Sequence, residues 1–133
     1  MTSLRQTPSR ARSWPALLYW PVTGLFFLIF GFSAVWTFVD PVGAAVDTAA
    51  LGFPAFFAVP LAVAKLLGLA VIALRRWPVL TGLAFAGFLY DVVLALSAHL
   101  AQSDVSRGSL AALGIVSTVA AFAVHRRRFG AAR

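Results

Sequence analysis

Long apolar runs separated by short polar segments are the main pattern along this chain. Arg12 and Asp40, for example, enclose a stretch without any charged residue. A helix of about 20 apolar residues crosses the ~30 Å hydrocarbon core of a bilayer. The pattern therefore predicts four spans, at Leu17–Phe38, Pro54–Leu74, Val79–Ala101 and Gly108–His125. The expected fold class is an all-α membrane protein, a bundle of four transmembrane helices.

The link between the first two spans has its own helix signals. Asp40 can cap a helix N-terminus, and Pro41 suits the first helical position. The segment from Val42 to Leu51 then runs to Gly52, a residue type that commonly ends helices. These signals predict a short helix on the outer surface, between the first and second spans.

Composition agrees with a membrane protein. The chain has 133 residues, of which 61% are hydrophobic and 11% are charged. Soluble domains carry about 25% charged residues, so too few charges are present to cover a soluble surface. Cysteine is absent from the sequence, which excludes disulfides, zinc fingers, iron–sulfur clusters and covalently attached c-type haem.

The net charge of +7 is explained by where the arginines lie. With four spans, the N-terminus, the link between spans two and three and the C-terminus lie on one side of the membrane. These segments have nine arginines, whereas the segments on the other side have only Arg107. This bias places both termini in the cytoplasm. We expect a bacterial-type cytoplasmic (inner) membrane protein with a mobile basic cytoplasmic tail (residues 1–13), a membrane domain (14–128) and a cytoplasmic tail (129–133). The lipid bilayer is the expected partner, and nucleic acid is not.

Lys65 and Asp91 are the ionisable residues in the middle of the second and third spans. Both lie on helix faces rich in small residues, where helices touch within membranes. The bulky Phe and Leu side chains are expected mostly to point elsewhere. Counted from Arg76, the two depths differ by four residues, about 6 Å along the axis. Because a lone charge in hydrocarbon is costly, we predict that they pair. The pair either fixes helix register or belongs to a ligand or proton-transfer site.

Other polar residues near the outer end of the third span extend this candidate site. His99 lies two turns beyond Asp91, Gln102 follows the same face, and Tyr90 and Ser97 occupy neighbouring faces. No metal site is predicted. His99 and His125 fall on opposite sides of the membrane, so a haem held by two histidines of one chain is not expected. HExxH, GxSxG, P-loop and GxGxxG motifs are all absent from the sequence.

Four short motifs, in this order and spacing, resemble the DoxX-like family of small four-helix membrane proteins. They are Leu51-Gly52-Phe53-Pro54-Ala55-Phe56-Phe57, Lys65-Leu66-Leu67-Gly68, Ala86-Gly87-Phe88-Leu89-Tyr90-Asp91 and Ser97-Ala98-His99-Leu100. Members often have a lysine late in the first helix after Phe-Ser-Gly, whereas this chain continues from Phe32-Ser33-Ala34 to Val35, Trp36 and Thr37. The resemblance implies that Lys65, Asp91 and His99 are family polar positions.

The resemblance also implies a link to membrane redox chemistry, since the family is named after a small subunit of a quinol oxidase. We therefore expect an accessory subunit or partner of a quinone-linked membrane redox system. No intrinsic cofactor is expected, quinone is the candidate ligand, and a redox protein or a second copy of this chain (a homo-oligomer) is a candidate partner. Two alternatives stay open: a small membrane enzyme that transfers a proton to or from a lipophilic substrate, and a proton-coupled transporter. A cavity containing His99 and Asp91 would favour ligand chemistry over a sealed structural pair.

Overall fold

The computed structural model describes residues 14–130, and the predicted tail of residues 1–13 lies outside the described residues, as do residues 131–133. The described elements are α1 (Trp14–Val39), α2 (Pro41–Ala50), the 3-10 helix η1 (Ala55–Phe57), α3 (Ala58–Leu74), α4 (Pro78–Ala101) and α5 (Val105–Phe129). Four segments are long and apolar enough to cross a membrane: Leu17–Val39, Ala55–Leu74, Pro78–Ala101 and Val105–Phe129. The predicted all-α membrane fold is confirmed.

The last helix is longer at both ends than the sequence predicted. Its first turn is capped by Asp104, whose Oδ1 accepts a hydrogen bond from the backbone N–H of Arg107 at 3.1 Å. At the other end the helix continues through the arginine run to Phe129, because arginine is a good helix former. The arginines at the two ends of the apolar run therefore lie within the helix and do not mark its ends.

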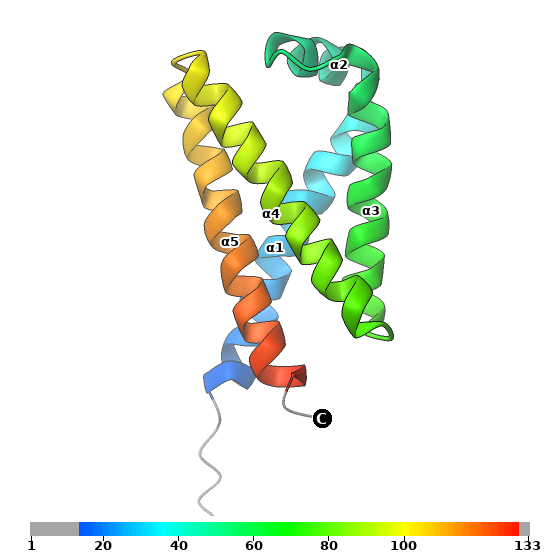
Figure 1. Cartoon of the computed structure of the whole chain (residues 1–133), viewed down its shortest axis with the longest axis vertical. Helices are drawn as coiled ribbons and strands as arrows, with labels where there is room; N and C mark the ends of the chain where they lie inside the picture. Colours follow the sequence, from blue (N-terminus) through cyan, green and yellow to red (C-terminus); the bar gives the residue numbers. More distant parts are fainter. Residues whose placement is uncertain (1–13, 131–133) are drawn as a thin grey trace, which may run out of the picture.

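The four long helices pack in a closed ring. Both α1 and α4 contact α3 and α5, so α1 and α4 face each other across the centre. Helix α2 lies across one end of the ring and contacts α1 and α3 (Figure 1). The α3–α4 turn and the C-terminal end of α5 lie at the opposite end (Figure 1).

Phenylalanine rings fill the centre of the ring. Phe26 and Phe30 of α1 meet Phe85 and Phe88 of α4, with neighbouring ring centroids 4.6–5.5 Å apart, and all four side chains are buried. The prediction that bulky side chains point away from the packing faces is wrong for these four. For Phe88 the reason lies in Gly68, where an added Cβ would lie 2.9 Å from the Phe88 ring. The small residue leaves room for a ring as well as for a neighbouring helix.

The short surface helix is confirmed as α2. The Asp40 side chain caps it by accepting a hydrogen bond from the backbone N–H of Gly43 at 2.9 Å. Just beyond the helix, Gly52 has φ +89°, a conformation that glycine adopts without steric cost. The Asp-Pro start and the glycine stop thus form a helix that covers the end of the bundle.

Candidate functional site

The Lys65 Nζ atom on α3 lies 3.2 Å from the Asp91 Oδ2 atom on α4, so the predicted pair is confirmed. The side chains are 15% and 17% exposed. Lys65 also donates a hydrogen bond to the hydroxyl of Ser33 on α1, at 3.4 Å. One ammonium group therefore links three helices within the bundle.

Apolar residues on each helix set the direction of these two side chains. On α3, Lys65 lies between buried Ala62 and Leu69, three and four positions away. On α4, Asp91 follows buried Phe88 by three positions. Such spacings place residues on one helix face. The face that packs into the bundle is thus the face that carries the charge.

Two cavities meet at the ion pair, beneath α2. The first has a volume of ≈ 380 Å³ and the second ≈ 420 Å³. Both are lined by Ser33, Asp47, Leu51, Lys65, Asp91 and Ala95. The pair is accordingly accessible from two spaces and is not sealed by packing.

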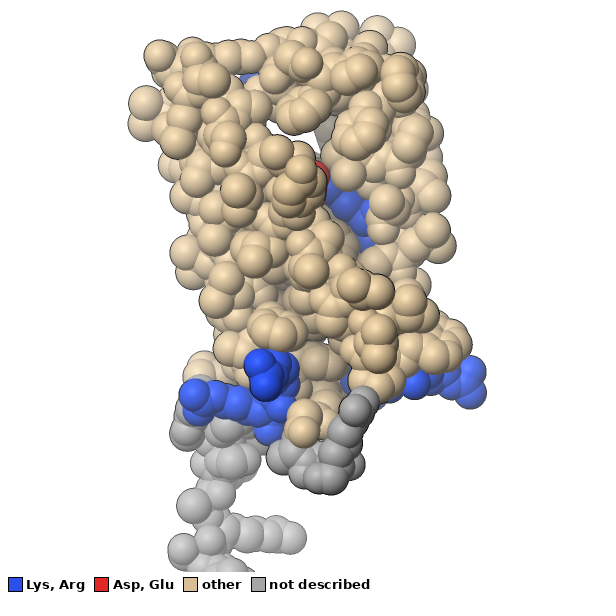
Figure 2. Space-filling view, in the orientation of Figure 1, with Lys and Arg blue, Asp and Glu red and all other residues tan. Residues whose placement is uncertain are grey.

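The walls of the first cavity are mainly apolar and aromatic. They include Phe32, Trp36, Phe53 and Phe57, together with Leu61. Figure 2 shows a hollow below α2 with charged atoms inside it, in a face that is otherwise uncharged over most of its height. A lipophilic molecule in this cavity would meet charged groups at the Lys65–Asp91 pair and at Asp47 of α2, and apolar side chains over most of the remaining wall.

His99 lines the second cavity together with Asp91. Its side chain is 13% exposed, and its Nδ1 atom lies 3.8 Å from the Asp104 Oδ2 atom. That separation is too long for a hydrogen bond, and Nδ1 has no hydrogen-bond partner among the described residues. Since His99 and Asp91 are eight residues apart, about 12 Å along the helix, they share the cavity without touching.

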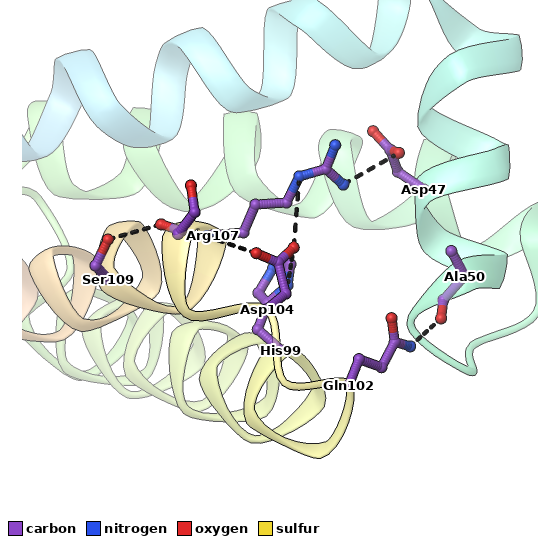
Figure 3. A network of polar contacts seen from close by, with 8 residues as sticks. Asp47, Ala50, His99, Gln102, Asp104, Arg107 and Ser109 are labelled. Carbon is purple, nitrogen blue, oxygen red and sulfur yellow. Dashed lines mark hydrogen bonds and ion pairs between the residues drawn. The ribbon is translucent and has the colours of Figure 1, made fainter.

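Polar contacts hold α2 to the turn between α4 and α5 and to the first turn of α5 (Figure 3). The Gln102 side-chain amide donates a hydrogen bond to the backbone carbonyl of Ala50. The Arg107 Nη1 atom lies 3.4 Å from the Asp47 Oδ1 atom, and the Arg107 Nε atom lies 3.8 Å from the Asp104 Oδ2 atom. We call α2 with these contacts the roof of the two cavities.

The sequence profile of the DoxX-like family matches residues 21–124, a range that includes all four long helices apart from their outermost turns. The chain belongs to the DoxX-like family. With its four apolar helices, this DoxX-like protein is an integral membrane protein. Neither the curated proteins nor the solved structures give a match.

Not every polar residue singled out in this DoxX-like protein reaches the cavities. Lys65, Asp91 and His99 do, and Gln102 supports the roof. Tyr90 is 67% exposed, and the Ser97 hydroxyl donates to a backbone carbonyl of its own helix at 2.8 Å; neither lines either cavity.

Four polar residues of this region were not predicted from the sequence as part of the site: Ser33, Asp47, Asp104 and Arg107. A usable signal existed for Asp104, because an aspartate at the start of an apolar helical run is a common N-cap. Ser33 and Asp47 carry no comparable local signal, since their partners lie 32 and 60 positions away. Within residues 14–130, no group of three or more His, Cys, Asp or Glu side chains is arranged to hold a metal ion.

Proposed function

We propose that this DoxX-like protein is an accessory subunit or partner of a membrane redox system, and that the cavities beside Lys65 and Asp91 take the ring of a quinone. The observation that supports this most is the ion pair at the junction of two cavities beneath α2. Small-molecule sites are typically apolar cavities of about 300–1,000 Å³ with a few polar groups that orient the ligand. The first cavity has this character.

The residues present suit a quinone. Such a molecule, when bound, supplies two-electron and two-proton redox chemistry. The Lys65 ammonium would donate a hydrogen bond to a ring oxygen, and the Asp91 carboxylate would accept one from a ring hydroxyl. The aromatic side chains of Trp36 and Phe57 offer surfaces against which a flat ring packs. In this proposal, a partner protein supplies or removes the electrons.

The proposed orientation places the two cavities in the outer half of a bacterial inner membrane, with both termini in the cytoplasm. The support is the separation of charge between the two ends of the bundle. The end with the α3–α4 turn and the α5 C-terminus has Arg75, Arg76 and the run 126–128, whereas the roof has Arg107. Short loops rich in arginine favour the cytoplasmic side.

A small membrane enzyme that moves a proton to or from a lipophilic substrate is the second candidate. The observation in its favour is that Asp91 and His99 line the same cavity, because a carboxylate and an imidazole are the usual proton-transfer groups. This candidate predicts exchange of carbon-bound substrate hydrogens with deuterated water in the absence of any electron donor. The quinone proposal predicts no exchange at carbon.

Fluorescence quenching by quinones tests the proposal. In a variant that keeps Trp36 and has phenylalanine at positions 14, 20 and 77, a short-chain benzoquinone or naphthoquinone should quench the remaining tryptophan saturably. Ala95 lines both cavities, so Ala95→Leu should abolish the saturable part. Ala70→Leu is the matched control, because Ala70 is exposed on α3 and lines neither cavity. Equal, non-saturable quenching in both variants contradicts a quinone site here.

A further inference from the structure

A cavity of ≈ 620 Å³ lies at the end of the bundle opposite the roof. It is enclosed by the α3–α4 turn, the first turns of α4 and the last turns of α5, and its lining includes Arg75, Thr81, His125 and Arg126. The proposed quinone site does not use this cavity. Its position at the helix ends, next to the arginine-rich turn, is the level at which lipid headgroups lie in a bilayer.

Two side chains in this cavity have polar atoms without partners. Thr81 is 4% exposed, and its hydroxyl makes no hydrogen bond within residues 14–130. The Nδ1 atom of His125 is buried and likewise lacks a hydrogen-bond partner among the described residues. Buried polar groups nearly always have a partner, and each one left without costs free energy. The wall of the cavity thus contains two residues with an unpartnered polar group.

The cationic side chains of the cavity are held by aromatic rings. The Arg75 guanidinium lies 4.8 Å from the centroid of the Phe129 ring, and that of Arg126 lies 5.7 Å from the centroid of the Phe122 ring. Within residues 14–130, neither guanidinium makes a side-chain ion pair with a carboxylate. The acidic residues of the chain all lie at the roof or in the cavities beneath it: Asp40, Asp47, Asp91 and Asp104. The positive charge here is thus left for an external anion.

An apolar groove continues from this cavity between α4 and α5. It has a volume of ≈ 180 Å³, its walls include Ala86, Leu89 and Val119, and it shares Gly82, Phe85 and Phe122 with the cavity. A Cβ added at Gly82 would meet no atom within 4 Å, so the junction is open. The cavity suits an anionic group, and the groove suits a hydrocarbon chain.

We propose that this cavity binds the anionic phosphate headgroup of an acidic phospholipid, with one acyl chain in the groove between α4 and α5. The guanidinium groups of Arg75 and Arg126 donate to the phosphate oxygens, as arginine commonly does. The Thr81 hydroxyl donates to the same group, and so does His125 when its proton is on Nδ1. The continuity of cavity and groove favours a lipid over a free anion.

Native mass spectrometry of the detergent-purified full chain tests the proposal. Phosphatidylglycerol should bind about tenfold more tightly than phosphatidylcholine with the same acyl chains, because the choline cation next to the phosphate of the latter is repelled by Arg75 and Arg126. Thr81→Val removes no charge and no protein hydrogen bond, yet it should weaken phosphatidylglycerol binding by about tenfold. Arg126→Gln should weaken it at least as much. Arg76→Gln is the matched control, because Arg76 lies outside the cavity and should lose only the general attraction of a surface charge, about fivefold or less.

A pair of glycine variants tests the groove. Gly82→Leu fills the junction and should weaken the binding of phosphatidylglycerol. Gly87→Leu makes the same change on the same helix, where an added Cβ also meets no atom within 4 Å, and should leave that binding intact. Thermal unfolding of each variant in detergent confirms that both are folded.

Three results overturn the proposal. The first is equal affinity for the two lipids. The second is wild-type phosphatidylglycerol binding by both Thr81→Val and Gly82→Leu, which would indicate attraction to surface charge alone. The third is inorganic phosphate that binds by itself with the same dependence on Thr81 and displaces the lipid, which would identify the occupant as a free anion.

Discussion

The Lys65 ammonium and the Asp91 carboxylate, 3.2 Å apart, join α3 to α4 at the place where the two cavities beneath the roof meet. A lone charge at the centre of a membrane helix costs about 2.5–3.5 kcal/mol on insertion scales. Pairing removes much of this cost and leaves both groups at a cavity wall. The same contact therefore serves helix packing and is available to a ligand.

Breaking the pair should cost more than removing it. Lys65→Ala leaves Asp91 without its cation, and Asp91→Ala leaves Lys65 without its anion, so each single variant should lower the free energy of unfolding by about 3 kcal/mol. The double variant should be more stable than either single variant, since no charge is left unpaired. Unfolding in mixed detergent micelles measures the free energy of unfolding of the wild type, the two single variants and the double variant. Additive losses would show that the two residues are not coupled.

The close packing of α4 against Gly114 of α5 should affect the free energy of unfolding. An added Cβ at Gly114 would lie 2.8 Å from Val92 Cγ1, and valine is stiff at χ1. We expect Gly114→Ala to cost about 1–3 kcal/mol of unfolding free energy.

The matched control for this substitution is Gly87→Ala. Its added Cβ would meet no atom within 4 Å, so the variant should be neutral or slightly stabilised. Equal effects of the two substitutions in thermal unfolding would contradict the observed contact of α4 with α5.

The helices could be predicted because local rules govern them, and the central ion pair because a lone charge in hydrocarbon is costly. Apolar run length sets the spans, the Asp40-Pro41 pair starts α2, and the cost of burying charge pairs Lys65 with Asp91. Residues one position apart differ by about 100° around a helix. With Asp91 facing the cavity, Tyr90 is therefore turned outward.

The polar contacts of the roof and the aromatic centre could not be predicted in the same way. The contact of Arg107 with Asp47 joins residues 60 positions apart, and it depends on where α2 lies over the bundle. Likewise, a glycine on a packing face can lie against a neighbouring helix backbone or against an aromatic ring. Which of the two it contacts depends on the neighbouring side chain, as Gly68 and Phe88 show. Helical periodicity alone does not determine such tertiary contacts.

Motion of the roof should control access to the cavities. Cysteines introduced at Ala50 and Gln102, whose side-chain amide bonds the Ala50 carbonyl, can be joined by a short bis-maleimide in this cysteine-free chain. Joining them should slow the dissociation of a bound short-chain quinone in stopped-flow fluorescence. The control is the same double variant capped with a monofunctional maleimide. An unchanged dissociation rate would mean that ligands enter elsewhere, between the helices.

The arginine distribution predicts a sidedness that labelling can measure. Ser3→Cys and Ser106→Cys, placed separately, should react with a membrane-impermeant maleimide from opposite sides of the membrane, position 106 from the outside of intact cells. Position 3 should react only after permeabilisation. Labelling of both positions from the outside would refute the proposed orientation.

Native mass spectrometry of the protein extracted in mild detergent from its membrane determines whether the cavities at the ion pair bind a quinone. The wild-type chain should retain a molecule with the mass of a quinone, and the folded Lys65→Ala/Asp91→Ala double variant should lose it. Ala70→Leu, altered on the exposed side of α3, should retain the molecule. If the wild-type chain carries no such ligand even after incubation with quinone, or if the double variant retains it unchanged, then the ion pair serves packing alone and the proposed quinone site is wrong.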